Sequence, residues 1–250
     1  MPRLHKLSPS DSVLLTAPLN TSYPLCFALL TLFTGSTLLL TSVSGAKISL
    51  LNATKSARER LKATHIIADS RAMPRFVEDL TQLAGKGGIG AKYAVWSTGR
   101  AISQGYMPAV TSKPGYLPSS LSALKMLYIV QPDIIGVSER LPSSTLAELR
   151  ILLSARVSLA LTTGQVAGYV AQTNVLDYRD KGALNCVGPV AASLELSLVG
   201  EEAEVGKTDG VGEVAVKGPS VVGRDLKEKV VLRGLKAMVD GDNTVVLVQH

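Results

Sequence analysis

A cluster of glycines at residues 85–90 has a spacing that could bind the phosphates of a dinucleotide. It reads Gly-Lys-Gly-Gly-Ile-Gly and matches the GxGxxG pattern of dinucleotide-binding loops. Such a loop must follow a strand and open a helix, because the helix N-terminus has to face the pyrophosphate. Here the glycines follow an expected helix at 73–83, and residues 91–95 look extended. We therefore interpret the cluster as a helix end followed by a flexible loop.

Thr162, Thr163 and Gly164 are the residues that we expect to contact a nucleotide if the chain binds one. They follow an apolar run at 157–161 that is typical of a buried strand, and α/β sheets bind ligands beyond the carboxyl ends of their strands. The alternative is structural, with the strand end turning directly into a helix at 165–172. No residue receives a catalytic role from its pattern.

Metal and disulfide chemistry receive no support from the cysteines. Cys26 and Cys186 are the only two, and neither belongs to a CxxC pair. This spacing predicts neither a zinc site nor a disulfide framework. Asp177 and Arg179 could form an ion pair, which on a surface has little effect on stability.

Alternating strands and helices are expected to position these residues. The hydrophobic patterns predict strands at 13–17, 37–43, 64–68, 124–130 and 157–161, helices at 25–33, 49–63, 73–83 and 145–154, and a long surface loop at 100–120. Strands that alternate with helices indicate an α/β fold.

The hydrophobic pattern of the sequence changes in its last quarter. Short apolar alternations at 194–199, 212–216, 230–232 and 244–248 are separated by glycine-containing turns, which is typical of strands. We predict an α/β portion over residues 1–185 and a smaller β-rich portion over residues 186–250.

The stretch between Asp11 and Lys47 contains no charged residue, and residues 24–43 are about long enough to cross a bilayer. Gly35 and several hydroxyl residues interrupt it, and its flanks lack the Lys/Arg asymmetry that orients a membrane span. We favour a buried helix and strand here. A transmembrane segment at 24–43, or a membrane contact through residues 25–43, is the alternative, so we expect the protein in the cytoplasm or on the cytoplasmic face of a membrane.

The net charge of +6 does not indicate nucleic-acid binding. Basic residues are interleaved with acidic ones, as in Arg58-Glu59-Arg60, whereas a nucleic-acid interface needs clustered positive charge. We therefore expect no nucleic-acid partner.

Three segments resemble the acyl-CoA synthetases of the adenylate-forming (AMP-binding) superfamily. Residues 212–221, Gly-Glu-Val-Ala-Val-Lys-Gly-Pro-Ser-Val, are similar to the family's GE(V/I)xV(R/K)GPxV strand, which residues 187–189 precede as a G-x-P turn. Residues 18–19 and 35–40 are similar to a Pro-Leu turn and a later G-A-x-x-V-L strand. Residues 121–161 follow the strand, helix, strand order that in the family ends in Y-G-x-T-E.

The resemblance is to fungal-type long-chain acyl-CoA synthetase-like proteins. It implies the layered sheet-and-helix core of an adenylation-type N-terminal domain with a smaller β-rich portion. It also implies a family activity that joins a fatty acid to ATP as an acyl-adenylate and then transfers the acyl group to CoA. ATP or AMP, CoA and magnesium are the implied cofactors, and a fatty acid or acyl chain is the implied ligand.

The chain departs from the family pattern where the chemistry is done. The Y-G-x-T-E motif corresponds to residues 159–163, in which only Thr162 matches and Thr163 replaces the acid that helps hold magnesium. The family's phosphate-binding loop lies upstream of residues 18–19, and no T-G-D follows Gly218-Pro219. We therefore expect a fragment or a degenerate form that lacks adenylation activity of its own. The alternative is a non-catalytic descendant that binds an acyl chain or a protein, associated with a membrane.

Overall fold

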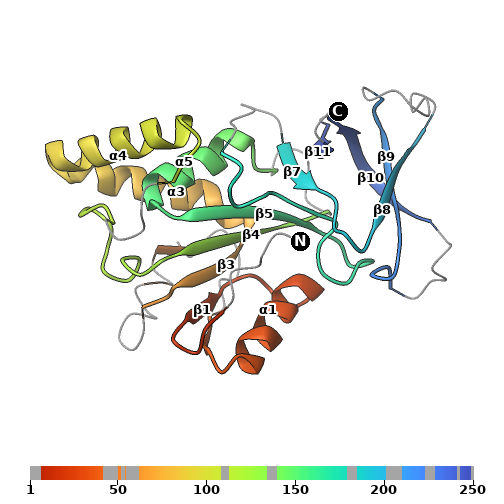
Figure 1. Cartoon of the computed structure of the whole chain (residues 1–250), viewed down its shortest axis with the longest axis horizontal. Coiled ribbons are helices and arrows are strands. Elements are labelled where there is room, and N and C mark those ends of the chain that lie inside the picture. Colours follow the sequence, from red (N-terminus) through yellow and green to blue (C-terminus); the bar gives the residue numbers. More distant parts are fainter. Residues whose placement is uncertain are drawn as a thin grey trace.

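The computed structural model describes residues 7–41, 50–51, 54, 62–107, 113–133, 140–178, 185–200, 210–222, 229–240 and 243–248. Two sheets organise this part of the chain (Figure 1). The first has the strand order β2-β1-β3-β4-β5-β6 and the second the order β7-β11-β10-β9-β8. The α/β fold class expected from the sequence is confirmed.

The first sheet is parallel except at one edge. Its strands are β1 (Ser12–Leu15), β2 (Thr37–Leu40), β3 (His65–Asp69), β4 (Met126–Pro132), β5 (Arg156–Thr162) and β6 (Ala171–Gln172), and only β6 runs antiparallel to its neighbour. β1, β3, β4 and β5 are buried along nearly their whole length. Continuous apolar strands of this kind need cover on both faces of the sheet.

Helices supply that cover from both sides (Figure 1). They are α1 (Ser22–Phe33), η1 (Ser70–Ala72), α3 (Met73–Lys86), α4 (Gly88–Ser103) and α5 (Ser143–Leu153). On one face, α3 and α5 bury Phe76, Leu80 and Leu149 against the sheet, and α4 packs outside them as an outer layer. On the other face, α1 packs Tyr23 and Phe27 against β1, β3 and β4.

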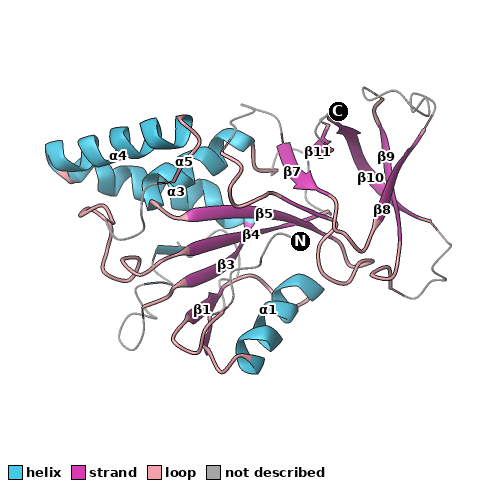
Figure 2. Cartoon of the chain, in the orientation of Figure 1, coloured by secondary structure: helices cyan, strands magenta, loops and turns pink. Residues whose placement is uncertain are grey.

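The second sheet is antiparallel and carries no helix among the described residues (Figure 2). Its strands are β7 (Asn185–Pro189), β8 (Glu195–Val199), β9 (Gly212–Lys217), β10 (Val230–Val239) and β11 (Thr244–Leu247). The fully buried Gln131 of β4 links the two sheets, because its amide nitrogen lies 3.4 Å from Asn185 Oδ1 of β7. The predicted β-rich character after residue 185 agrees with this sheet, while the division into two portions stays a prediction.

Several sequence-based expectations about local structure are wrong. The glycine cluster is not a helix end followed by a flexible loop, because α3 runs to Lys86, α4 begins at Gly88, and only Gly87 lies between them. Residues 91–95 are accordingly helical and not extended. Residues 165–172 form turns that lead into β6 and not a helix. In the predicted loop at 100–120, α4 continues to Ser103. The predicted helix at 49–63 lies mostly outside the described residues.

The apolar segment at 25–43 is only partly buried. Phe27 and Ala28 of α1 face the sheet, whereas Leu29, Leu32 and Phe33 are exposed. The prediction that this segment is buried is therefore wrong for the outward-facing half of α1. Among the described residues, no helix is both long enough and apolar enough to cross a bilayer.

Asp11 and Lys125 form an ion pair that connects the starts of β1 and β4. Lys125 Nζ donates to Asp11 Oδ1 at 2.7 Å, and the backbone N–H of Ser8 donates to Asp11 Oδ2 at 2.9 Å. Burial would raise the pKa of Asp11, but the hydrogen bonds from Lys125 and Ser8 lower it well below its ordinary value. The ionised carboxylate therefore stabilises the folded state.

We expect Asp11→Asn to lower the free energy of unfolding at pH 7 by about 1–3 kcal/mol, since it removes a charge-assisted pair. The depressed pKa means that this stabilisation is present above the unfolded-state pKa of about 4 and is lost as the pH falls below it. Urea denaturation of both proteins between pH 7 and pH ~3 measures the difference. A difference that does not shrink in acid would contradict this account.

Lys113 and Tyr116 bind the carboxyl end of α5. Lys113 Nζ donates to the carbonyls of Leu153 and Ser154 at 2.9 and 2.7 Å, and the Tyr116 hydroxyl donates to the Leu152 carbonyl at 2.7 Å. These donors satisfy carbonyls that have no partner within a helix. Burial lowers the pKa of Lys113 to about 8 and raises the pKa of Tyr116 to about 12.

Because the pKa of Lys113 is depressed, the unfolded chain binds more protons than the folded chain between pH 8 and its ordinary pKa of about 10.4. We expect the free energy of unfolding to rise with pH in this interval, and Lys113→Met to remove the rise. Urea midpoints measured between pH 8 and about 9.5, below the ordinary titration of tyrosine, test this. Equal pH slopes in the two proteins would refute it.

Candidate functional site

The carboxyl ends of β1, β4 and β5 meet at one edge of the parallel sheet, where ligands bind in open α/β folds. Just beyond β4 and β5, the backbone N–H of Asp133 donates to the Thr162 carbonyl at 2.8 Å. At the end of β1, the Thr16 hydroxyl donates to the Ile67 carbonyl of β3 at 3.1 Å. A nucleotide bound by the predicted residues would lie at this edge.

The predicted residues lie at this edge, but the side chains of both threonines point into the protein. Thr162 is fully buried, and its hydroxyl lies 3.5 Å from the Gln131 carbonyl. Thr163 is 2% exposed, and its hydroxyl accepts from the Gln165 N–H at 3.3 Å. Only Gly164 is exposed. Of these three residues, only the backbone of Gly164 is accessible to a ligand.

The loop at residues 163–170 is held against the start of α1. The Ser22 hydroxyl donates to the Val166 carbonyl at 2.9 Å and accepts from the Gly168 N–H at 2.7 Å. The next residue, Tyr23, packs edge-on against Tyr169 with ring centroids 5.8 Å apart. The contact joins segments that lie almost 150 residues apart in sequence, and it closes this side of the sheet edge.

A second contact holds the same loop from the side of β9. The Ala167 N–H donates to the Ser220 carbonyl at 2.7 Å, and the Val222 N–H donates to the Gln165 carbonyl at 2.9 Å. Val166 and Val221 form an isolated antiparallel bridge between these hydrogen bonds. The 163–170 loop is therefore fixed on both sides by hydrogen bonds.

At the position where the resemblance expects an acidic magnesium ligand, this sheet edge has no carboxylate. The position of the expected acidic ligand holds the buried Thr163 hydroxyl, which is a poor ligand for a hard cation. Within the described ranges, no group of three or more His, Cys, Asp or Glu side chains could hold a metal ion. The amides of Val166, Ala167 and Gly168 already donate to the Thr163 carbonyl, the Ser220 carbonyl and the Ser22 hydroxyl.

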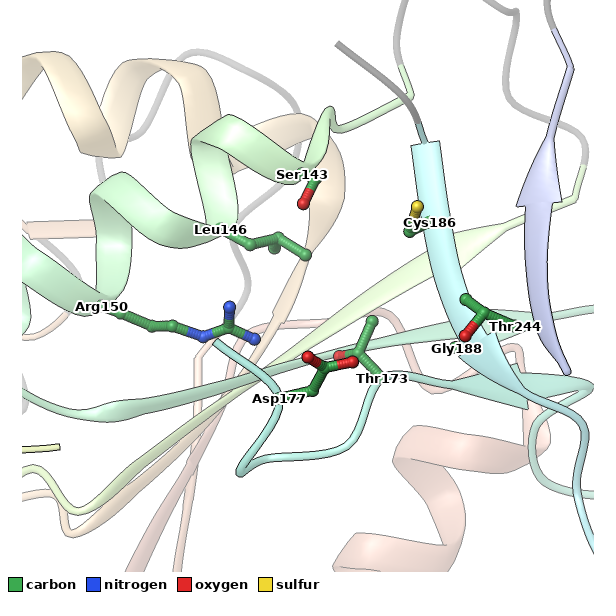
Figure 3. A pocket seen from close by; sticks show the side chains of 8 residues that line it. All are labelled: Ser143, Leu146, Arg150, Thr173, Asp177, Cys186, Gly188 and Thr244. Atoms are coloured by element: carbon green, nitrogen blue, oxygen red, sulfur yellow. The ribbon is translucent and has the colours of Figure 1, made fainter. Parts of the chain in front are cut away.

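A small pocket lies elsewhere, between α5 and the second sheet (Figure 3). Its walls come from α5, from the segment after β6, from β7 and from β11; they consist of Ser143, Leu146, Arg150, Thr173, Asp177, Cys186, Gly188 and Thr244. None of the predicted site residues lines it. Gly188 is required here, since its φ is +85° and an added Cβ would lie 2.2 Å from the Gln172 carbonyl oxygen.

The charges in this pocket face one another. Figure 3 shows the Arg150 guanidinium pointing toward the Asp177 carboxyl group. The guanidinium also donates to the Val157 carbonyl at 3.1 Å and stacks over the Tyr178 ring at 5.7 Å. Arg179, which the sequence suggested as the partner of Asp177, lies outside the described residues. The pocket lining contains one positive and one negative side chain, Arg150 and Asp177, so it does not present the net positive charge of an anion site.

Sequence reasoning missed the role of Ser22. A hydroxyl residue before an apolar helix predicts a local helix cap, and Ser22 is indeed the first residue of α1. Its hydrogen bonds, however, go to a loop that follows β5. No local pattern could have revealed this distant partner.

The comparison with known families decides the identity of the fold. The profile of one family, described as AMP-binding enzyme, matches residues 1–224. The chain belongs to the AMP-binding enzyme family. The resemblance seen in the sequence is thereby confirmed at the level of the family, while its fungal long-chain detail stays a prediction. A search among curated proteins found no match.

Solved structures share the fold of this AMP-binding chain. One is o-succinylbenzoate CoA synthetase from Bacillus subtilis in complex with ATP and magnesium, at 14% identity and a TM-score of 0.62 over 99% of this chain. Another is a benzoate CoA ligase from Burkholderia xenovorans LB400, at 14% identity and a TM-score of 0.61 over 96% of this chain. The anthranilate CoA ligase AuaEII with anthranoyl-AMP also matches at 14% identity and 0.61, over 96%.

The AMP-binding chain spans less than half of each of these proteins. It covers 43% of the synthetase, 42% of the benzoate ligase and 40% of the anthranilate ligase. At such low identity the likeness establishes the fold of the N-terminal adenylation domain and not the substrate.

We expect Ser22→Ala to lower the free energy of unfolding by about 1–2 kcal/mol, because it leaves the Val166 carbonyl and the Gly168 N–H without their partner. The matched control is Ser97→Ala. The Ser97 hydroxyl donates to the Ala94 carbonyl of its own helix, so its removal should cost less than about 0.5 kcal/mol. Urea denaturation compares the two, and equal losses would show that the contact with the 163–170 loop is unimportant.

Proposed function

We propose that this chain is a degenerate adenylation-domain protein of the AMP-binding family that does not form acyl-adenylates by itself. The family reaction joins a carboxylic acid to the AMP part of ATP with release of pyrophosphate, then transfers the acyl group to the CoA thiol with release of AMP. It needs side chains that hold phosphate and magnesium. The observation that carries the proposal is the closed sheet edge, where Thr162 and Thr163 are buried and the 163–170 loop is bonded on both sides.

The substrate class within this proposal is a carboxylic acid with an apolar body. The sequence resemblance favours fatty acids, whereas the names of the structural neighbours refer to succinylbenzoate, benzoate and anthranilate. Family membership suggests ATP or AMP and CoA as further ligands. Magnesium is the least supported of them, because Thr163 stands in place of the acid.

A second candidate function is protein binding without catalysis. The observation that favours it is the row of exposed leucines on α1, with Leu29 57% and Leu32 64% exposed. An apolar helix face of this kind is typical of an interaction surface. Acyl-chain binding, the other form of this alternative, would need an apolar cavity, and the pocket of Figure 3 is lined by charged and polar groups as well.

We expect the purified chain to show no exchange of labelled pyrophosphate into ATP with magnesium and with fatty acids of several lengths, benzoate or anthranilate. The physical reason is that transition-state charge on the phosphates would meet no positioned donor or metal. A benzoate CoA ligase serves as the positive control for the assay. Exchange above background in a folded sample would contradict the proposal.

Thr163→Glu sharpens the same test, since it restores the acid of the family motif. We expect it not to restore exchange, and to destabilise the fold by several kcal/mol, because the 2% exposed site would bury an unpaired carboxylate. Exchange gained by this variant would show instead that the missing acid is the sole defect.

A further inference from the structure

The outward face of α4 combines apolar, aromatic and basic side chains. Ile89 is 88% exposed, Tyr93 66% and Trp96 57%, and Lys92 and Arg100 are exposed among them. Their positions follow the i, i+3, i+4, i+7 and i+11 spacing of one side of a helix. The residues that α4 buries lie on the opposite side of the helix. We call these five exposed residues the α4 face.

α4 is the outermost helix on its side of the first sheet. It packs against α3 and α5, which lie between it and the strands (Figure 1). Gly99 lies beside α5, where an added Cβ would be 3.6 Å from Ile151 Cδ1. A helix that forms the outside of a layer can meet a flat surface along its length. The α4 face therefore has the position that contact with a flat surface requires.

Every charged side chain on α4 is positive. No acidic residue occurs between Asp79 and Asp133, whereas five basic residues do. The neighbouring helices α3 and α5 contain acids, but neither Lys92 nor Arg100 belongs to an ion pair within the described part of the chain. These cations are therefore available to an anionic surface outside the protein.

The aromatic side chains of the α4 face contact one another and one of its cations. The Tyr93 and Trp96 rings lie 5.9 Å apart, and the Arg100 guanidinium lies 5.6 Å from the centroid of the Trp96 ring. Tyrosine and tryptophan combine an apolar body with a polar end, and both are enriched where a membrane meets water. Lysine and arginine beside them can extend their charged ends to lipid headgroups. This composition is typical of a helix that lies in the plane of a membrane surface.

Other partners fit the α4 face less well. A second copy would place four cations in one contact with no acid of either α4 between them. A nucleic acid is bound through dense clusters of cations, whereas here the apolar and aromatic side chains outnumber the two cations. An anionic lipid surface accommodates both kinds of side chain, since its headgroups attract the cations and its interfacial layer takes up the aromatic rings.

We propose that the α4 face binds the surface of an anionic phospholipid bilayer, with α4 parallel to the membrane plane. Ile89, Tyr93 and Trp96 then enter the headgroup layer, while Lys92 and Arg100 contact the anionic headgroups. This contact needs no membrane-spanning helix. It uses the opposite side of the first sheet from the apolar segment at 25–43, and it does not depend on whether the chain forms acyl-adenylates.

Partition of the purified chain onto vesicles tests the proposal. Sedimentation compares vesicles of phosphatidylcholine alone with vesicles of phosphatidylcholine and phosphatidylserine. We expect at least ~10-fold stronger partition onto the mixed vesicles, since each cation near an anionic membrane strengthens binding about 5-fold. Salt should weaken this partition by screening the charges. No partition onto the mixed vesicles, or equal partition onto both kinds, would overturn the proposal.

Matched substitutions locate the contact. Arg100→Gln should weaken partition onto the mixed vesicles about 5-fold, and Ile89→Asn should weaken it by removing apolar contact. The controls are Arg233→Gln, at an exposed site on β10 of the second sheet, and Leu32→Asn, at a 64% exposed site on α1. Neither control should change the partition. All four sites are exposed, so each variant should keep the thermal unfolding transition of the parent. Weaker partition of Leu32→Asn but not of Ile89→Asn would assign the contact to α1 and overturn the proposal.

Trp96 gives an independent readout, because it is the only tryptophan of the chain. Its fluorescence emission should move to shorter wavelength when the mixed vesicles are added, and brominated lipids should quench it. Emission that stays unchanged while the chain sediments with the vesicles would show that another surface binds them. An emission shift with single-stranded DNA or polyglutamate, but none with vesicles, would assign the α4 face to a nucleic acid or an acidic protein. Either result would overturn the proposal.

Discussion

The need to bury the parallel strands on both faces governs most of this structure. β3, β4 and β5 expose almost none of their residues, so their backbone and side chains must be covered from two sides. On one face, α3 and α5 do this with a broad apolar surface, and α4 adds an outer layer. On the other face, α1 alone provides the helical cover among the described elements. One face of the sheet is therefore covered by two layers of helices and the other face by a single helix.

This asymmetry explains why α1 is apolar all round. Its inner side packs Tyr23 and Phe27 on the sheet, with the Phe27 and Tyr128 rings 4.6 Å apart, and its outer side carries leucines that meet solvent. A helix that only covered a sheet would have a polar outer face. The composition of α1 is thus suited to a helix packed between two layers. Among the described residues, the first sheet forms one of these layers.

The same packing determines what happens at the ligand edge of the sheet. The N-terminus of α1 lies beside the loop that follows β5, and Ser22 fastens the two together. The loop that follows β5 is hydrogen-bonded both to α1 and to the segment after β9. Fold and family are retained, while the polar groups at the edge are used within the protein.

The sequence by itself determined the order of strands and helices and the family, because apolar periodicity and the Gly212–Lys217 motif are local properties of the chain. It failed at residues 91–95, which directly follow the glycine cluster, and at residues 165–172, where contacts with neighbouring elements decide the local structure. It placed Thr162–Gly164 at the correct strand end but could not give their burial. Only the tertiary structure decided that Thr162 and Thr163 face inward, that Ser22 closes the edge and that half of α1 stays exposed, since each of these depends on contacts between residues far apart in the chain.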